Sequence, residues 1–147
     1  MSKTKTLLCP VDFSEGSSNA VQRAAHLANE LGAEVELFHA YILPVLALPD
    51  GPVVATPDYV TRITSAAQKG LEEHAAVLER EGVKVTTKLA EGDPRTAICE
   101  RAEEIGAYMI VMGTHGRAGA AHWLLGSVAE RVVRTSKIPV LTVRLEK

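Results

Sequence analysis

Apolar runs of strand length recur along the whole chain. Apolar residues are frequent in 5–12, 34–42 and 138–144 and fill 107–112 without interruption, and polar and apolar residues alternate across 83–90. Continuous runs are typical of parallel strands buried on both faces, whereas alternation is typical of a strand with one exposed face. The pattern therefore predicts five strands, of which 83–90 lies at an edge of the sheet.

Helical patterns separate these strands. Apolar residues recur at intervals of three and four in four segments: 14–32, 57–81, 93–106 and 126–135. Ser14 or Ser17 is suited to cap the first helix, and Gly32 to end it. Asp93 is suited to cap the third, with Pro94 at its first position. The sequence thus predicts four helices, one between each pair of consecutive strands.

Strict alternation of strands and helices indicates an α/β fold. Such a chain forms an open, mostly parallel five-stranded sheet with right-handed crossovers and helices on both faces. The sequence contains no linker, internal repeat or low-complexity tract. We therefore expect residues 1–147 to form a single domain.

Residues 43–57 do not fit this plan. The segment "LPVLALPDGPVVATP" is rich in proline and apolar residues and is long for a connection within a compact domain. One interpretation is a lid-like cover over the strand ends. The other is a mobile gate or a surface for a partner.

Composition and charge exclude several classes of protein. The 147 residues are 46% hydrophobic, and 16 Lys and Arg balance 18 Asp and Glu, which argues against nucleic-acid binding. No apolar run is long enough to span a membrane, and the first residues do not form a signal peptide. Cys9 and Cys99 have no metal-type spacing and suit buried, reduced thiols. We expect a cytoplasmic protein that binds neither nucleic acid nor membrane.

Two loops carry the residues suited to binding a ligand. In parallel sheets, ligands bind at the carboxyl ends of the strands where the winding reverses. The first strand ends at Asp12, whose carboxylate suits ribose hydroxyls. The fourth is followed by "GTHGRAGAAHWLLGSV", in which Gly113 and Gly116 leave the backbone accessible, while Gly126 and Ser127 begin a helix that attracts phosphate.

Structural roles explain the same residues equally well. Ser127 and Glu130 form a capping-box pattern, and Asp12 is suited to cap the first helix. His115 and Arg117 offer donors to terminal phosphates, but the loop lacks the lysine of a P-loop. Neither a catalytic set nor a convincing metal site is evident. From spacing alone, phosphate binding and an ordinary connection remain equally good interpretations.

Together these motifs resemble the universal stress protein family. The spacing Gly113-x2-Gly116-x9-Gly126-Ser127 is similar to the family's ATP-binding motif. "LLCPVDFSE" resembles its first strand, and "LLGSVAERVVRTSKIPVLTVR" resembles its last helix and strand. The likeness extends over nearly the whole chain.

The resemblance implies a fold, a ligand and an assembly. It implies strand order 3-2-1-4-5 and a homodimer formed through the last strand, at about Ile138 to Arg144. It also implies binding of ATP, with AMP or ADP as alternatives and with or without Mg²⁺. Adenine would lie at Pro10, Val11 and Ala40, and ribose at Asp12. The residues implied around the phosphates are Met112, Gly113, His115, Gly116, Arg117, Gly126, Ser127 and Val128.

The chain departs from the family pattern in two places. Phe13 stands where many members have glycine, which would narrow the entry beside the ribose. Residues 118–123, "AGAAHW", differ from the usual loop. The leading hypothesis is an ATP-binding regulatory protein of the stress response with at most slow hydrolysis. A nucleotide-independent interaction module is the alternative, and a true ATPase or nucleotidyl transferase is the third hypothesis.

Overall fold

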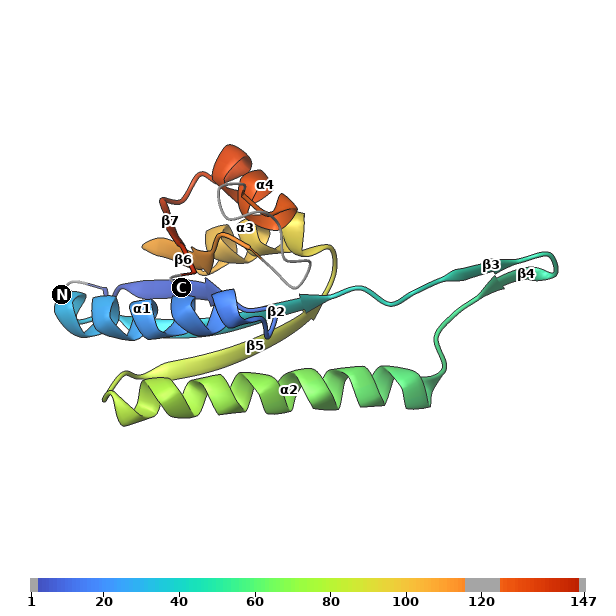
Figure 1. Ribbon diagram of the computed structural model, residues 1–147, viewed down its shortest axis with the longest axis horizontal. Coiled ribbons are helices and arrows are strands. Elements are labelled where there is room, and N and C mark those ends of the chain that lie inside the picture. Colours follow the sequence, from blue (N-terminus) through green and yellow to red (C-terminus); the bar gives the residue numbers. More distant parts are fainter. Residues whose placement is uncertain (1–2, 116–124, 146–147) are drawn as a thin grey trace.

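Five parallel strands form the central sheet. The computed structural model describes residues 3–115 and 125–145. The strands are β1 (Thr6–Pro10), β2 (Glu34–Tyr41), β5 (Val85–Glu91), β6 (Met109–Gly113) and β7 (Val140–Val143). They lie in the order β5-β2-β1-β6-β7, with every adjacent pair parallel (Figure 1). Counted along the chain without the separate hairpin strands, this order is 3-2-1-4-5, as predicted.

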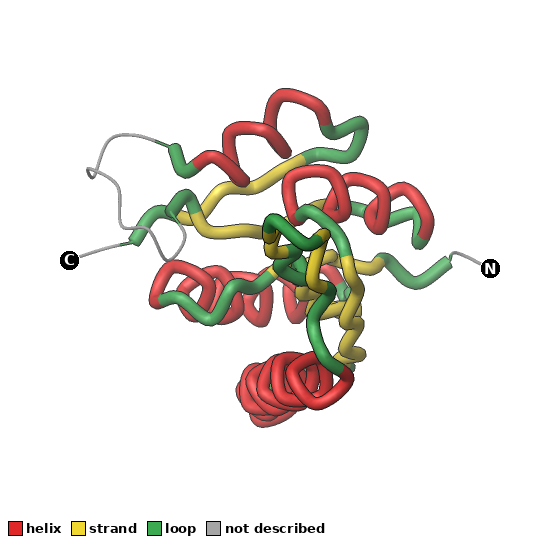
Figure 2. Tube along the Cα trace, turned by 90° about the vertical axis from the view of Figure 1, so that its right-hand side faces the viewer, coloured by secondary structure: helices red, strands yellow, loops and turns green. Residues whose placement is uncertain are grey.

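Helices cover both faces of the sheet. They are α1 (Glu15–Leu31), α2 (Pro57–Arg80), α3 (Pro94–Glu104) and α4 (Ser127–Thr135). Helices α1 and α2 pack on one face, and α3 and α4 on the other, so that the sheet runs between two helical layers (Figure 2). Consecutive residues of a strand point to opposite faces of the sheet: Leu7 lies in the core under α1, and Leu8 in the core under α3 and α4. Within the described residues, no helix is long and apolar enough to cross a membrane.

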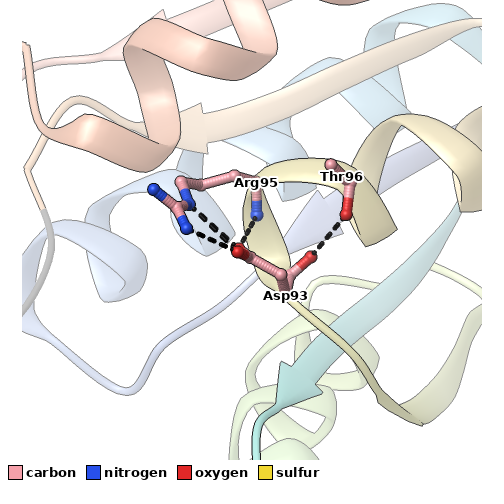
Figure 3. A network of polar contacts seen from close by, with 3 residues as sticks. All are labelled: Asp93, Arg95 and Thr96. Carbon is pink, nitrogen blue, oxygen red and sulfur yellow. Dashed lines mark hydrogen bonds and ion pairs between the residues drawn. The ribbon is translucent and has the colours of Figure 1, made fainter.

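Local side chains fix the start of two helices. Ser14, not Ser17, is the N-cap of α1, and its side chain accepts a hydrogen bond from the Ser17 N–H. Asp93 caps α3 by accepting from the Arg95 N–H (Figure 3). The Arg95 guanidinium also donates to this carboxylate, and these bonds lower the pKa of Asp93 to about 2. The predicted start of α3 is confirmed.

Residues 43–57 contain a hairpin that the sequence analysis missed. Strands β3 (Leu46–Leu48) and β4 (Gly51–Val53) pair antiparallel with each other and extend away from the sheet (Figure 1). The prediction of a cover over the strand ends is wrong. The two-residue turn at Pro49 and Asp50 folds the segment back on itself, so its backbone finds hydrogen-bond partners without the body of the protein.

A buried ion pair ties α3 to the sheet. The Arg101 guanidinium donates from Nε and Nη2 to the two carboxylate oxygens of Glu36, over 2.8 and 2.7 Å. Glu36 is only 7% exposed. Hydrogen bonding to Glu36 raises the pKa of Arg101. In this bidentate geometry, each charged group forms two hydrogen bonds with the other. The sequence pattern gave no indication of this ion pair.

Both cysteines are free thiols, but only Cys9 is buried as predicted. Cys9 is fully buried in β1, and burial raises its pKa to about 12. A thiol with such a pKa remains protonated at neutral pH and reacts poorly. Cys99 on α3 is half-buried, with its sulfur 3.7 Å from the Thr135 hydroxyl.

Candidate functional site

A cavity of about 250 Å³ lies where the winding of the sheet reverses. It opens at the carboxyl ends of β1, β2 and β6, beside the first residues of α3 and α4. Ten of the twelve residues predicted from the sequence line it: Pro10, Val11, Asp12, Ala40, Met112, Gly113, His115, Gly126, Ser127 and Val128. The other two, Gly116 and Arg117, lie outside the described residues.

The structure adds lining residues that sequence reasoning missed. They are Ser17, Phe38, His39, Pro94, Ile98, Thr114 and Ala129. Phe38, Ile98 and Ala129 belong to the core cluster under α3 and α4, together with Ala40 and Met112. One wall of the cavity is therefore apolar. Pro94 and Ile98 come from α3, which carried no motif and so gave no sequence signal for this contact.

Gly113 packs against the beginning of α1. A Cβ atom on Gly113 would lie 2.9 Å from the Gly16 carbonyl oxygen, and one on Gly16 would lie 2.7 Å from the His115 carbonyl oxygen. Real Cβ atoms do not approach backbone that closely. The structure thus gives Gly113 a packing role beside the predicted one, and it identifies Gly16, which the sequence analysis overlooked, as its partner.

The carboxylate of Asp12 is held at the mouth of the cavity by two serines. Asp12 Oδ1 accepts from the Ser14 N–H at 3.0 Å and from the Ser17 hydroxyl at 2.6 Å. The Ser17 hydroxyl oxygen in turn accepts from the Asp12 N–H at 2.9 Å. Because Ser14 is the N-cap of α1, the alternative in which Asp12 caps this helix is wrong. The serines fix the direction in which the carboxylate points.

Phe13 turns away from the cavity. Its φ of 65° is the only positive value for a non-glycine residue in the described part of the chain. Its ring contacts His39, at 4.7 Å between centroids, and lies against Gly70 of α2, where a Cβ atom would come within 2.5 Å. The expectation that Phe13 narrows the entry beside the ribose is therefore wrong. The left-handed backbone directs the side chain to the opposite face of the sheet.

Helix α4 begins at the cavity without a side-chain cap. Its N-cap is Gly126, whose N–H donates to the Thr114 carbonyl oxygen at 2.6 Å. The capping-box interpretation of Ser127 is wrong, because Ser127 is already the first helical residue and Glu130 pairs with Arg134 instead. The N–H groups of residues 127–129 cannot bond within the helix. They lie at the cavity together with the positive end of the helix dipole.

His115 contributes a buried polar atom to the same cavity. Its Nδ1 lies 3.0 Å from the Thr114 hydroxyl, while its Nε2 is buried with no hydrogen-bond partner in the described part of the chain. A buried polar atom of this kind destabilises the protein unless a ligand or water forms a hydrogen bond with it.

The described residues contain no cluster suited to a metal ion. Among residues 3–115 and 125–145, no three His, Cys, Asp or Glu side chains are grouped to hold an ion.

Known proteins share both the sequence and the fold of this chain. Residues 3–144 match the Universal stress protein family. A universal stress protein of Methanocaldococcus jannaschii, MJ0531, is 35% identical over 144 residues, covering 97% of this chain and 84% of that protein.

Two solved structures are similar over almost their full length. The hypothetical protein MJ0577, from the same archaeon, is 28% identical with a TM-score of 0.81, covering 97% of both chains. A universal stress protein in complex with cAMP is 28% identical with a TM-score of 0.73, covering 97% of this chain and 98% of that one. This chain belongs to the universal stress protein family.

Proposed function

We propose that the cavity binds an adenine nucleotide, with ATP as the main ligand and ADP or AMP as alternatives. The observation that carries the proposal is the uncapped start of α4 on the same cavity as the buried His115 Nε2. Helix N-termini attract phosphate through unpaired N–H groups and the helix dipole. The cAMP complex of a related protein supports an adenine ligand in this fold.

The cavity offers suitable contacts for the base, the ribose and the phosphates of a nucleotide. The apolar side of the cavity, near Pro10, Val11 and Ala40, suits the flat base. The carboxylate of Asp12, fixed by its serines, suits the ribose hydroxyls. The phosphates fit at Met112, Gly113, His115, Gly126, Ser127 and Val128, and the proposal extends to Gly116 and Arg117. Mg²⁺ would accompany the phosphates by binding their oxygens.

The proposed role is regulatory, in the stress response of the cytoplasm, with at most slow hydrolysis of ATP. Asp12 Oδ1 already accepts two hydrogen bonds, His39 Nδ1 lies 2.7 Å from the Val11 carbonyl oxygen, and His115 Nδ1 contacts Thr114. The three titratable side chains that line the cavity in the described part of the chain are thus each held by a neighbour. Such groups suit positioning of a ligand more than proton transfer. We therefore propose that the protein acts by binding the nucleotide, so that the bound and the empty protein differ in their regulatory effect.

Nucleotide binding is tested directly with the purified protein. Heat denaturation is expected to release an adenine nucleotide, detected by chromatography. Calorimetric titration of the stripped protein is expected to show saturable binding of ATP, with GTP as the control for the base. Absence of released nucleotide, together with no heat of binding at millimolar ATP, would contradict the proposal.

We also propose a homodimer formed through the strand at Ile138 to Arg144. Strand β7 is an edge strand, half-buried along its length, and an unpaired edge invites pairing with another chain. The Pro139 carbonyl accepts from the Ile110 N–H of β6 and the Val143 carbonyl from the Thr114 N–H just after β6, so the polar backbone groups of Thr142 point toward the open edge. These groups are available for a second copy.

Proline at position 142 tests this dimer. Thr142→Pro removes one N–H from the open edge and leaves the bonds to β6 in place, so the molar mass measured by light scattering is expected to fall by half. Thr86→Ala, on the opposite edge strand, serves as the control. An unchanged mass for Thr142→Pro would count against an interface at β7.

A further inference from the structure

An apolar hairpin, residues 42–54 and here called the arm, stands away from the body of the protein (Figure 1). Its large apolar side chains are exposed to solvent by 46–68%: Ile42, Val45, Leu46, Leu48, Val53 and Val54. Asp50 is the only charged residue between positions 42 and 57. A contiguous exposed apolar surface of this kind marks an interaction site.

The arm lacks the support that a two-stranded ribbon needs. An isolated hairpin is marginally stable in water and requires a third strand or a packed face. Here β3 and β4 pair only with each other and form a sheet separate from the main one. Ala47 pairs with Pro52 on one face, and Leu46 with Val53 on the other, so both faces are apolar.

Proline chemistry makes the two edges of the arm unequal. Because Pro52 has no N–H, the Ala47–Pro52 pair cannot exchange two hydrogen bonds, and the bonds fall at Leu46–Val53 and Leu48–Gly51. The backbone polar groups of Ala47 and Pro52 therefore point outward. The β4 edge has lost its central donor, whereas the β3 edge presents both the N–H and the carbonyl of Ala47.

We propose that the arm is a docking site for the arm of a second copy of this chain, joined antiparallel through the two β3 edges. An antiparallel pair of identical strands is related by a two-fold axis, so the Ala47 N–H of each copy can donate to the Ala47 carbonyl oxygen of the other. The near absence of charge favours an apolar partner of the same composition over a charged one. Pairing gives each ribbon a third and fourth strand and covers apolar side chains on both copies.

Cysteine cross-linking tests the geometry. We would place Ala47→Cys in a Cys99→Ser background, leaving only the buried Cys9 besides the new thiol. A short bismaleimide is expected to convert most of the protein at tens of micromolar into a covalent dimer. Asp50→Cys, an exposed position at the tip of the same arm, is the matched control. In antiparallel pairing the tips point apart, so it is expected to cross-link at least fivefold less.

A pair of proline variants provides an independent measurement. Ala47→Pro removes the outward N–H of β3 and is expected to reduce the sedimenting mass by half, whereas Pro52→Ala, in the facing position of β4, is expected to leave it unchanged. Circular dichroism verifies that both variants fold.

Cross-linking at position 47 that persists in Thr142→Pro would show that the arms pair independently of β7. Equal cross-linking at 47 and 50, or an unchanged mass for Ala47→Pro, would overturn the proposal. Protein that stays unlinked at position 47 would likewise overturn it, and would leave the arm to a partner other than a second copy.

Discussion

Replacing Ser127 by aspartate is expected to weaken ATP binding roughly 30-fold while leaving the protein as stable as before or slightly more stable. Ser127 is the first residue of α4 and is exposed at the cavity. A carboxylate there interacts favourably with the helix dipole, by about 0.3–1 kcal/mol. The same carboxylate repels a bound phosphate by roughly 2 kcal/mol at a partly solvated site, which corresponds to the expected loss of affinity.

The opposite signs of these two effects separate binding from folding. Calorimetry measures the affinity and thermal unfolding the stability, and rising salt should reduce the difference in affinity. Ser127→Asn is the matched control, because it has the size of aspartate without the charge. Adenosine, which carries no phosphate, should bind wild type and Ser127→Asp alike. Equal ATP affinity in Ser127→Asp and Ser127→Asn would mean that phosphate does not lie at α4.

Replacing Arg101 by methionine is expected to lower the free energy of unfolding by about 3 kcal/mol. Methionine retains much of the apolar volume of the arginine side chain but leaves the Glu36 carboxylate buried without its bidentate partner. Removing one member of a buried ion pair costs about 3–5 kcal/mol, and the partial exposure of Arg101 places the expectation at the lower end. Urea unfolding measures the change.

Two further variants isolate the cause. Glu36→Leu combined with Arg101→Met removes both charges and is expected to recover most of the lost stability. Arg95→Met breaks an ion pair that is exposed on the surface, so a much smaller change in the free energy of unfolding than for Arg101→Met is expected. If the double variant were no more stable than Arg101→Met, the loss would come from packing and not from an unpaired carboxylate.

The predictable parts of the fold depend on interactions between residues close in sequence. Asp93 caps α3 through a hydrogen bond to the N–H two residues away, so local sequence was sufficient to locate this helix. The hairpin also had a local signal, Asp50 followed by Gly51, although the turn itself falls at Pro49 and Asp50 and Gly51 begins β4. Pro52 occupies a position where the missing N–H is not needed, which only the pairing register reveals.

Ten of the residues predicted for the site line one cavity, but two of the local roles considered for its loops were wrong. Ser127 and Glu130 match a capping box in spacing, yet the helix begins one residue earlier than the box requires, with Gly126 as its N-cap, and the Gly126 N–H donates to the Thr114 carbonyl oxygen. Phe13 was expected at the cavity, but its left-handed backbone directs the ring toward His74 and Gly70 of α2. Both outcomes depend on contacts between segments distant in sequence.

By itself, the sequence determined the alternation of strands and helices, the parallel sheet and the two loops that meet at its carboxyl edge, because hydrophobic periodicity and helix caps act over a few residues. The tertiary structure alone decided which backbone groups remain unpaired at α4, why Gly113 must meet Gly16, that Glu36 needs Arg101, and that the arm points into solvent. These features arise from close approach of distant segments, which periodicity does not encode.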